Sequence, residues 1–277
     1  MTGKQAILRA LRYLLIGTLV AAAGFPIYWL ATTALSSNAE IFGAGQVPYP
    51  QPHHLPALIG QLAEVPIALW LFNSTIIAGG TTVLSLLLGS LLGYALSRFR
   101  FHGRGPVGFM LFMTQVLPEA LILVPLYAMF VSLGLLNSLT GVVLANVGFS
   151  LPVAAFILKS AMDGIPHEIE ESAQVDGCPR IAILTMILMP LIAPSAAAAA
   201  VICFFAGWNE FLFAMTFISD RSLWPASVGL ASFIGQYETP MSAVMGAALV
   251  FSIPAIVFFL LVQRKIVAGL THGAVKG

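Results

Sequence analysis

Long stretches without a charged residue dominate this sequence, and they limit how the chain can fold. A helix that crosses the hydrocarbon core of a membrane needs about 20 consecutive apolar residues. Charged residues make up only 8% of the chain and hydrophobic residues 59%, whereas an ordinary soluble domain carries about 25% charged residues. The sequence therefore predicts an all-α, polytopic membrane protein that forms one transmembrane domain over residues 1–277. The uncharged stretches predict six spans, at about residues 14–35, 71–96, 107–133, 141–160, 190–218 and 241–263.

Proline and small residues within these spans indicate how the helices bend and pack. A proline inside a helix removes a backbone hydrogen bond and bends the helix, so kinks are expected at Pro118, Pro125, Pro152 and Pro254. Small residues let two helix backbones approach closely, which is expected at Gly89, Gly93 and along 195–200. A bundle of kinked, closely packed helices suits a transporter, but it also suits many other membrane proteins.

The basic residues fall almost entirely on one side of the predicted spans. If the N-terminus lies inside the cell, only Arg221 among the 12 lysines and arginines faces outward. An excess of Lys and Arg in cytoplasmic loops is the usual mark of membrane orientation, so both termini are predicted to be cytoplasmic. The first apolar stretch is longer than the core of a secretory signal and no clear cleavage site follows it, so we expect it to remain as a span.

Several classes of function find no support in the sequence. The basic residues form no run that could follow the phosphates of a nucleic acid, so no nucleic-acid partner is expected. Cys178 and Cys203 lack the spacing of a zinc site. The pair His53-His54 could bind a metal, but without a supporting carboxylate or thiol such a pair is more often loop surface, so no metal site is predicted. No nucleophile, base and orienting group occur at an informative spacing, so the chain is not expected to be an enzyme.

The segment between the fourth and fifth predicted spans, residues 161–189, is rich in acidic residues. Pro166 suits the first position of a helix, acidic residues favour the N-terminal end, and Gly177 can adopt the left-handed conformation that ends a helix. These residues predict a short cytoplasmic helix from Pro166 to Gly177. A solvated linker helix would explain it as well as a helix that fits a protein groove. The face that suits a groove is formed by Ile165, Ile169, Ser172, Ala173 and Asp176.

The same segment resembles a family motif. The motif is E-A-A-x3-G-x9-I-x-L-P, the EAA motif of ABC-importer permeases, and the chain departs from it mildly, with Ser172 for Ala and Met189 for Leu. The matching residues are Glu171-Ser172-Ala173, Gly177, Ile187 and Met189-Pro190. Further short stretches resemble the maltose-type carbohydrate branch of these permeases and extend over nearly the whole chain: Asn73-Ser74, Pro118, Pro125-Leu126, Gly134–Asn137, Leu151-Pro152, Trp208–Phe211 and Gly269–Lys276.

The resemblance implies a permease subunit of an ATP-driven, binding-protein-dependent ABC importer in a bacterial cytoplasmic membrane. Such a subunit binds no cofactor itself, because separate ATPase subunits hold ATP and Mg²⁺, and this chain contains no G-x-x-x-x-G-K-[ST] phosphate loop. The implied partners are two ATPase subunits or a homodimeric ATPase, a second homologous permease that completes a heterodimer, an extracytoplasmic substrate-binding protein, and membrane lipid. The residues implied to couple the chain to the ATPase are Glu170, Glu171, Ser172, Ala173, Asp176 and Gly177.

The C-terminal tail also resembles the end of these permeases. It is small and apolar rather than an ordinary solvated end, so we expect it to dock against the ATPase. A frayed terminus is the alternative, because chain ends are commonly disordered. The residues expected to dock are Gly273, Ala274, Val275 and Lys276.

Two acidic residues, Glu119 and Glu210, lie inside predicted spans. A charge at the centre of a membrane costs about 2.5–3.5 kcal/mol on insertion scales, which makes such residues functional candidates. An aromatic ring beside an amide and a carboxylate suits the hydroxyl groups and apolar faces of a sugar. The sequence predicts a substrate path at Trp208, Asn209, Glu210 and Glu119, and structural hydrogen bonding is the alternative for both acids.

The resemblance favours an oligosaccharide or modified sugar as substrate, with a glycerophosphodiester as the alternative. No Lys or Arg lies in the central part of a predicted span, which argues for a neutral sugar. The residues alone leave two other functions open: a proton-coupled secondary transporter that uses the two carboxylates, and an assembly subunit without a substrate path.

Overall fold

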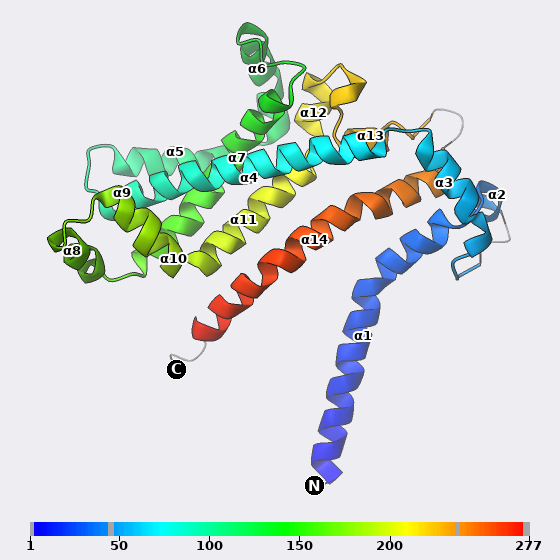
Figure 1. Ribbon diagram of the computed structural model, residues 1–277, viewed down its shortest axis with the longest axis horizontal. Helices are drawn as coiled ribbons and strands as arrows, with labels where there is room; N and C mark the ends of the chain where they lie inside the picture. Colours follow the sequence, from blue (N-terminus) through cyan, green and yellow to red (C-terminus); the bar gives the residue numbers. More distant parts are fainter. Residues whose placement is uncertain (1–2, 44–46, 236–238, 274–277) are drawn as a thin grey trace. The chain divides into compact units, whose positions relative to one another are not determined.

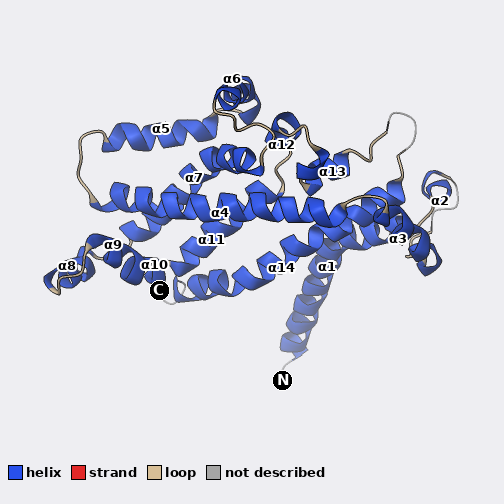
Figure 2. Cartoon of the chain, turned by 45° about the horizontal axis from the view of Figure 1, so that its top comes forward, coloured by secondary structure: helices blue, strands red, loops and turns tan. Residues whose placement is uncertain are grey.

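The computed structural model describes residues 3–43, 47–235 and 239–273, which fall into two compact units. Unit 1 comprises residues 1–67 and 230–253, and unit 2 comprises residues 68–229 and 254–277. Every regular element within the described ranges is a helix (Figure 2), so the all-α prediction is confirmed. Five of these helices are long and apolar enough to cross a membrane, and a bent pair makes up to six. That the whole chain forms one domain stays a prediction.

Unit 1 holds the first span and the segment that follows it. Its elements are α1 (Gly3–Ala34), α2 (Asn38–Phe42), η1 (Pro52–His54), α3 (Leu55–Ala63) and the first part of α14 (Met241–Gly273). Asn38 ties α2 to the start of α14, because its side chain donates to Thr239 O at 3.3 Å and accepts from Met241 N at 3.1 Å. Along α1, by contrast, large apolar side chains such as Leu15 and Val20 are exposed, as expected for a helix that contacts lipid or a partner.

Unit 2 is built around three long helices. These are α4 (Ile67–Arg98), α7 (Leu139–Asp163) and α11 (Ala193–Trp208), which lie side by side (Figure 1). The other elements of the unit are α5 (Arg104–Val116), α6 (Glu119–Ser132), α8 (His167–Val175), α9 (Arg180–Ala182), the π-helical segment η2 (Ile183–Leu188), α10 (Met189–Leu191), α12 (Leu212–Phe217), η3 (Arg221–Leu223), α13 (Ala226–Ala231) and the second part of α14.

Glycines on α4 and α11 allow the close packing of this bundle. A Cβ atom on Gly93 would lie 3.0 Å from Ala155 O and 3.1 Å from Lys159 N of α7. A Cβ atom on Gly89 would lie 3.0 Å from Ala154 Cβ. The predicted close approach at Gly89 and Gly93 is therefore confirmed, and the partner helix is α7. On α11, Gly207 approaches α4 in the same way, with a Cβ position 2.8 Å from Ala78 Cα.

The third predicted span, residues 107–133, for which a kink at Pro118 was expected, is not one continuous helix in the structure. The structure has two helices there, α5 and α6, with a bend of 107° between their axes. Leu117 and Pro118 form the break, and both have extended backbone, with ψ values of 126° and 129°. A proline disfavours helical backbone in the residue before it, so the helix stops rather than bending gently. The other three prolines, Pro125, Pro152 and Pro254, lie inside continuous helices.

Two buried clusters hold unit 2 together. One joins α4, α6, α7 and α12 and includes Ile77, Phe130, Val142, Phe213 and Phe217. The other lies where α4 and α7 end and η2 begins, and it includes Tyr94, Leu158, Met162, Ala173, Ile183 and Leu188. Ala173 belongs to α8, so this second cluster attaches the short helix to the bundle.

Candidate functional site

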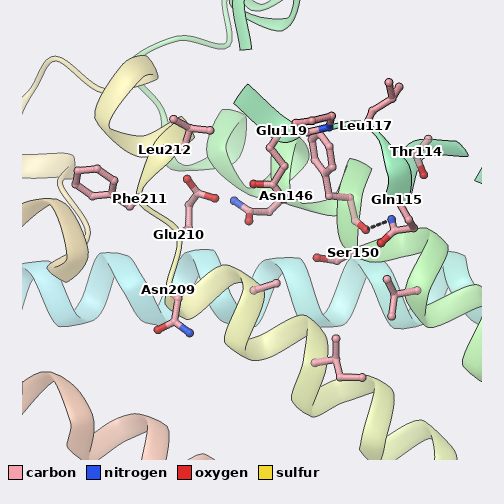
Figure 3. Close-up of a pocket in the computed structure, with 15 residues that line it drawn as sticks. Thr114, Gln115, Leu117, Glu119, Asn146, Ser150, Asn209, Glu210, Phe211 and Leu212 are labelled. Carbon is pink, nitrogen blue, oxygen red and sulfur yellow. Dashed lines mark hydrogen bonds between the residues drawn. The ribbon is translucent and has the colours of Figure 1, made fainter. Parts of the chain in front are cut away.

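A cavity of about 570 Å³ lies inside unit 2, beside the breaks in two apolar helices. It is formed by α5, α6, α7, α11 and the residues that connect α11 to α12. Its polar lining comes from Thr114, Gln115, Glu119, Asn146, Ser150, Asn209 and Glu210 (Figure 3). None of the 15 lining residues, all of them within the described part of the chain, is a lysine or arginine. The cavity thus offers carboxylates, amides and hydroxyls without a fixed positive charge.

Both predicted intramembrane acids border this cavity, and each lies where a helix is interrupted. Glu119 is the first residue of α6, directly after the break at Pro118. Glu210 lies in the short connection between α11 and α12, where Asn209 and Phe211 depart from helical geometry. A broken helix leaves backbone groups without their usual partners, so both acids stand beside polar backbone.

The Glu210 carboxylate also has a structural role. Only 6% of the residue is exposed, and its Oε1 atom accepts hydrogen bonds from Phe213 N at 2.6 Å and Ala214 N at 3.4 Å. These N–H groups begin α12, where an acceptor is favourable. The main-chain oxygen of Glu210 accepts from the Ser227 hydroxyl. The structural alternative considered for Glu210 therefore has direct support, and the same carboxylate still faces the cavity.

The structure separates the three consecutive residues that the sequence grouped together. Figure 3 shows the side chains of Glu210, Asn146 and Glu119 directed toward one another, whereas Asn209 points to the opposite side of the chain. Trp208 does not line the cavity; only 2% of it is exposed, and its ring stacks on Phe204 at 5.6 Å between centroids. Phe204 in turn stacks on Phe258 of α14 at 3.7 Å. Trp208 is thus part of the packed interior.

Sequence reasoning missed the contribution of α5 and α7 to the cavity. Asn146 and Ser150 lie four residues apart on α7, which places them on one face of the helix. Gln115 of α5 donates to Phe149 O at 2.9 Å and ties the two helices together beside the cavity. Polar residues at a four-residue spacing inside an apolar span were the signal that could have revealed this wall.

The second candidate site is the short helix α8. It begins at His167, one residue later than predicted, because Pro166 has extended backbone with ψ of 140° and acts as the cap. Gly177 has φ of +83°, as predicted for the residue that ends the helix. Cys178 N donates to Ala173 O at 2.9 Å and Gly177 N donates to Gln174 O at 3.0 Å, which is the hydrogen-bond pattern of a helix that ends at a left-handed glycine.

The residues predicted to couple α8 to an ATPase lie on two different faces. Glu170 and Ala173 point into unit 2 and are buried. Glu171, Ser172 and Asp176 are exposed, as is Val175, whose side chain is 88% accessible. The exposed face, with Val175 beside acidic and hydroxyl groups, is available to a partner protein. The buried face, with Glu170 and Ala173, packs within this chain.

An ion pair attaches the buried face of α8 to the end of α4. Arg98 Nε donates to Glu170 Oε1, Arg98 Nη2 donates to Ile165 O at 2.9 Å, and the Tyr94 hydroxyl donates to Glu170 Oε2 at 3.2 Å. The Glu170 carboxylate therefore has a partner on each oxygen, which is what a buried charge requires.

A second set of contacts joins α4 to α7 at the same end of the bundle. The Ser97 hydroxyl donates to Asp163 Oδ1 at 2.6 Å, and Lys159 Nζ donates to Asp163 Oδ2 at 2.5 Å. Arg180 lies over the ring of Phe99 at 4.7 Å. Figure 1 shows α8 and α9 at this end of unit 2. The helix α8 is thus fixed to the ends of two long helices rather than hanging from a flexible loop.

The predicted C-terminal docking residues lie almost entirely outside the described part of the chain. Gly273 is the last residue of α14, and Ala274, Val275 and Lys276 fall outside the described residues.

Long apolar helices, a polar cavity at two helix breaks and a short helix fixed to the bundle define a membrane permease. The chain belongs to the family of binding-protein-dependent transport system inner membrane components, whose model matches residues 58–269. It is therefore a multi-pass transport component of the membrane rather than an enzyme, and it belongs to a transport system that depends on a binding protein. The prediction of an ABC-importer permease of the maltose-type branch is confirmed.

Relatives of known name agree with this assignment. The chain is 32% identical to the sulfoquinovosyl glycerol transport system permease protein SmoH of Agrobacterium fabrum, over 97% of this chain and 94% of that protein. It is also 32% identical to the trehalose/maltose transport system permease protein MalG of Thermococcus litoralis, over 91% of each chain. Among solved structures, its fold is similar to a chain of a bacterial ABC transporter that imports the acidic polysaccharide alginate, with a TM-score of 0.76, 22% identity, and coverage of 95% of this chain and 98% of that one.

Proposed function

We propose that this permease imports a neutral sugar, an oligosaccharide or a modified sugar, through the cavity lined by Glu119, Asn146 and Glu210. The observation that carries the proposal is the cavity itself, where amides, carboxylates and hydroxyls gather beside the breaks in two apolar helices. These groups match the hydroxyls of a sugar as donors and acceptors, and Phe149 and Phe211 add apolar surface to the same lining. The volume lies within the range of small-molecule sites, about 300–1,000 Å³.

The names of the relatives support the class of substrate. The permeases that this chain is similar to are named for sulfoquinovosyl glycerol, a sugar derivative with an anionic sulfonate group, and for the neutral sugars trehalose and maltose, so the names support a sugar and not its charge. A glycerophosphodiester is the second candidate, but a phosphate group is usually bound by Arg or Lys, and the described lining of the cavity offers neither. The absence of that charge favours the neutral sugar.

For coupling, we infer that the exposed face of α8 enters a cleft of an ATPase subunit. ATP and Mg²⁺ are then held by that partner, and this chain holds no cofactor of its own. Glu171, Ser172, Val175 and Asp176 would contact the ATPase, because all four are exposed. When two ATPase subunits close on ATP, the helix moves, and its ion pair with Arg98 carries the motion to α4.

The remaining assembly follows from the family resemblance and the charge distribution. We infer a bacterial cytoplasmic membrane, with both termini in the cytoplasm, and a heterodimer with a second homologous permease that supplies the other half of the path. The tail from Gly273 to Lys276 would dock on the ATPase. Deleting residues 271–277 should then lower ATPase activity or the yield of assembled complex. If both stay unchanged, the result would favour the alternative of a frayed terminus that does not dock.

The proposal is tested by uptake into proteoliposomes that hold the whole importer with its binding protein. Radiolabelled trehalose, maltose and glycerophosphocholine serve as probes. We expect ATP-dependent uptake of a sugar, reduced at least severalfold by Asn146→Ala and Glu119→Gln at unchanged complex yield. Glu64→Gln is the matched control, because Glu64 is an exposed carboxylate at the end of α3. Uptake of glycerophosphocholine alone would select the second candidate, and normal sugar uptake by both cavity variants would remove the cavity from the path.

A further inference from the structure

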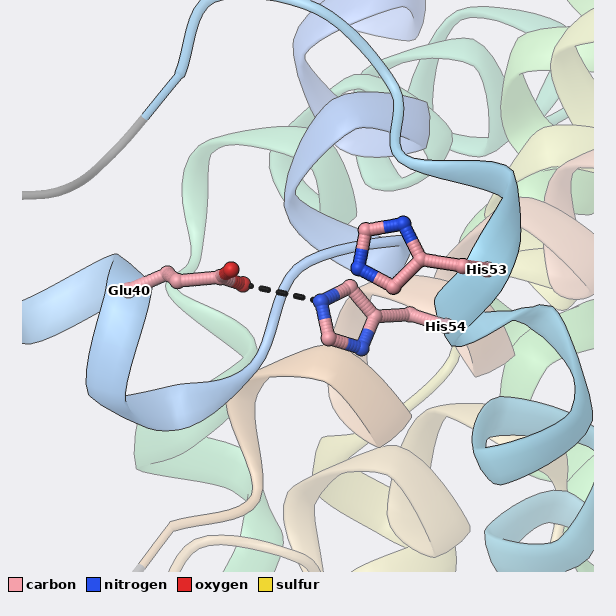
Figure 4. A group of neighbouring side chains, drawn as sticks. All are labelled: Glu40, His53 and His54. Atoms are coloured by element: carbon pink, nitrogen blue, oxygen red, sulfur yellow. Dashed lines mark ion pairs between the residues drawn. The ribbon is translucent and has the colours of Figure 1, made fainter.

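Three side chains that could bind a metal ion meet in unit 1, whereas the cavity and α8 belong to unit 2. They are Glu40 of α2 and the consecutive residues His53 and His54 of η1 (Figure 4). One ligand atom from each side chain lies within 4.8 Å of the other two, and Glu40 Oε2 is 3.0 Å from His54 Nε2. The sequence alone offered the histidine pair without a supporting carboxylate, and the fold supplies one from 13 residues away.

Local structure fixes each of the three residues. The helix α2 begins with a capping box, in which the Ser37 hydroxyl accepts from Glu40 N and the Glu40 carboxylate accepts from Ser37 N at 2.8 Å. This box holds the Glu40 side chain against the start of α2. On the other side, Pro52 begins the short helix η1, which directs both histidine rings toward Glu40. The three ligands are therefore positioned before any ion arrives.

The spacing of the ligand atoms fits a tetrahedral metal ion. Zinc–nitrogen and zinc–oxygen bonds of about 2.1 Å place two ligand atoms of such a site about 3.4 Å apart. The observed separations, from 3.0 Å for one pair to at most 4.8 Å, bracket this distance. Small rotations of the side chains would bring all three atoms to one ion.

The hydrogen bonding of the Glu40 carboxylate and of His54 Nε2 also suits a bound cation. The Glu40 carboxylate accepts hydrogen bonds from the backbone N–H of Ser37 at 2.8 Å and from the Ser37 hydroxyl at 2.9 Å, which hold it in place as an acceptor. His54 Nε2 is shielded from solvent yet makes no well-aligned hydrogen bond among the described residues, although Glu40 Oε2 is near. A buried ring nitrogen without an aligned partner is unusual, and a metal ion would satisfy it.

We propose that Glu40, His53 and His54 form a binding site for a divalent transition-metal ion, Zn²⁺ in the first place. Two imidazoles and one carboxylate are a common zinc ligand set, and they leave a coordination position for water or for a donor of another molecule. His53 is exposed, so solvent reaches the cluster. The bound ion would join α2 to η1 and close the chain between them into a loop.

The test uses the full-length protein, purified through a tag without histidine and treated with a chelator. Zn²⁺ is titrated in competition with a chromophoric chelator, and Co²⁺ is followed by its visible absorption in a low-coordinate site. We expect one ion per chain. Loss of even an outer hydrogen bond to a metal ligand weakens binding by about 10–100-fold, so His54→Ala and Glu40→Gln should each weaken it at least tenfold.

Two features keep the result interpretable. Gln at position 40 retains the capping box, so Glu40→Gln separates metal binding from the folding of α2. His53→Ala removes an exposed ring and serves if His54→Ala does not fold. His102→Ala is the matched control, because His102 lies in the loop after α4, outside the cluster. Wild-type protein without saturable binding, wild-type affinity in His53→Ala and Glu40→Gln, or an equal loss in His102→Ala would overturn the proposal. None of these readouts depends on transport.

Discussion

Arg98, the last residue of α4, forms an ion pair with Glu170 in the middle of α8, 72 residues further along the chain. Both side chains are almost wholly buried, with 6% and 5% exposed. The pair links the short helix directly to a long helix of the bundle. A displacement of α8 therefore has to move the end of α4 or break a buried charge pair.

Removing one partner of this pair should be costly. Glu170→Gln leaves the Arg98 guanidinium buried without its counter-charge, and such losses cost about 3–5 kcal/mol. We expect a clear drop in the melting temperature of the purified permease and loss of ATP-driven uptake, with membrane insertion retained. Thermal unfolding in detergent and uptake into proteoliposomes measure the two effects.

The matched control for the buried pair is the exposed pair of Lys159 and Asp163, with 27% and 42% of their side chains exposed. Exposed ion pairs contribute about 0–1 kcal/mol, so Lys159→Gln should change the melting temperature little. Equal effects of Lys159→Gln and Glu170→Gln would contradict the central place given to Arg98 and Glu170.

The end of α8 depends on a left-handed backbone conformation at Gly177, which is unfavourable for residues with a side chain. Gly177 has φ of +83°, and left-handed backbone costs an ordinary residue about 1–2 kcal/mol. Gly177→Val should misdirect the end of the helix and abolish uptake, while Gly177→Asn should retain part of it because Asn tolerates this conformation. Gly164→Ala is the control, since Gly164 ends α7 with φ of −78° and has room for a Cβ atom. Normal uptake by the Gly177→Val complex would contradict the prediction.

The contact of α4 with α7 should respond to the size of residue 93. Adding a branched side chain at Gly93 forces atoms against Ala155 O and Lys159 N, which lie about 3 Å from the Cβ position, and overpacking costs about 1–3 kcal/mol. Gly93→Val should reduce the yield of folded protein in size-exclusion chromatography. Gly79→Val, where no atom lies within 4 Å of the Cβ position, should not. Equal yields would mean that the helices can separate without loss.

Acid should loosen the loop after α12. The pKa of Asp220 lies below its ordinary value because Ser222 N donates to its carboxylate at 2.8 Å. A carboxyl whose pKa is lower in the folded state stabilises the fold above its unfolded pKa, and this contribution is lost as the pH falls below that value. Hydrogen exchange at Ser222–Trp224, corrected for intrinsic rates, should therefore stay constant from pH 7 to about pH 5 and accelerate as the pH falls below the unfolded pKa of an Asp, about 3.9. In Asp220→Asn the acid-induced change should disappear, and its persistence would assign the effect to another group.

The positions of the long helices could be predicted because charges are rare and fall between them. Five of the six predicted spans correspond to long apolar helices of the structure, from 7–34 to 241–265. The break at Leu117 and Pro118 could not be predicted as a stop, because a proline inside an apolar stretch can equally bend a continuous helix, as Pro152 shows. The distinction depends on what packs around the proline.

The candidate sites were predicted in part. Glu119 and Glu210 were found because polar groups inside spans are rare, and both line the cavity, whereas Asn209 borders it with its side chain turned away. The burial of Trp208 and the Arg98–Glu170 pair depend on which helices become neighbours, and no local pattern contains that information. The same holds for Asn73, whose side chain donates to Ser222 O and Trp224 O, at 2.9 and 3.0 Å. Its place in a family-like dipeptide marked it, but only the fold shows that it holds a distant loop.

Substitutions on the two faces of α8 should affect different molecules: the buried face affects the permease itself, and the exposed face affects its contact with the ATPase. A change at Glu170 or Ala173 alters this polypeptide before any partner is present, so it should already be visible in the purified permease as a lower melting temperature. A change at Val175 or Asp176 alters an exposed side chain, so it should remain silent until the ATPase is added. Screening variants of this helix once alone and once in the assembled importer would therefore map the contact surface of the ATPase on the permease, without any structure of the complex.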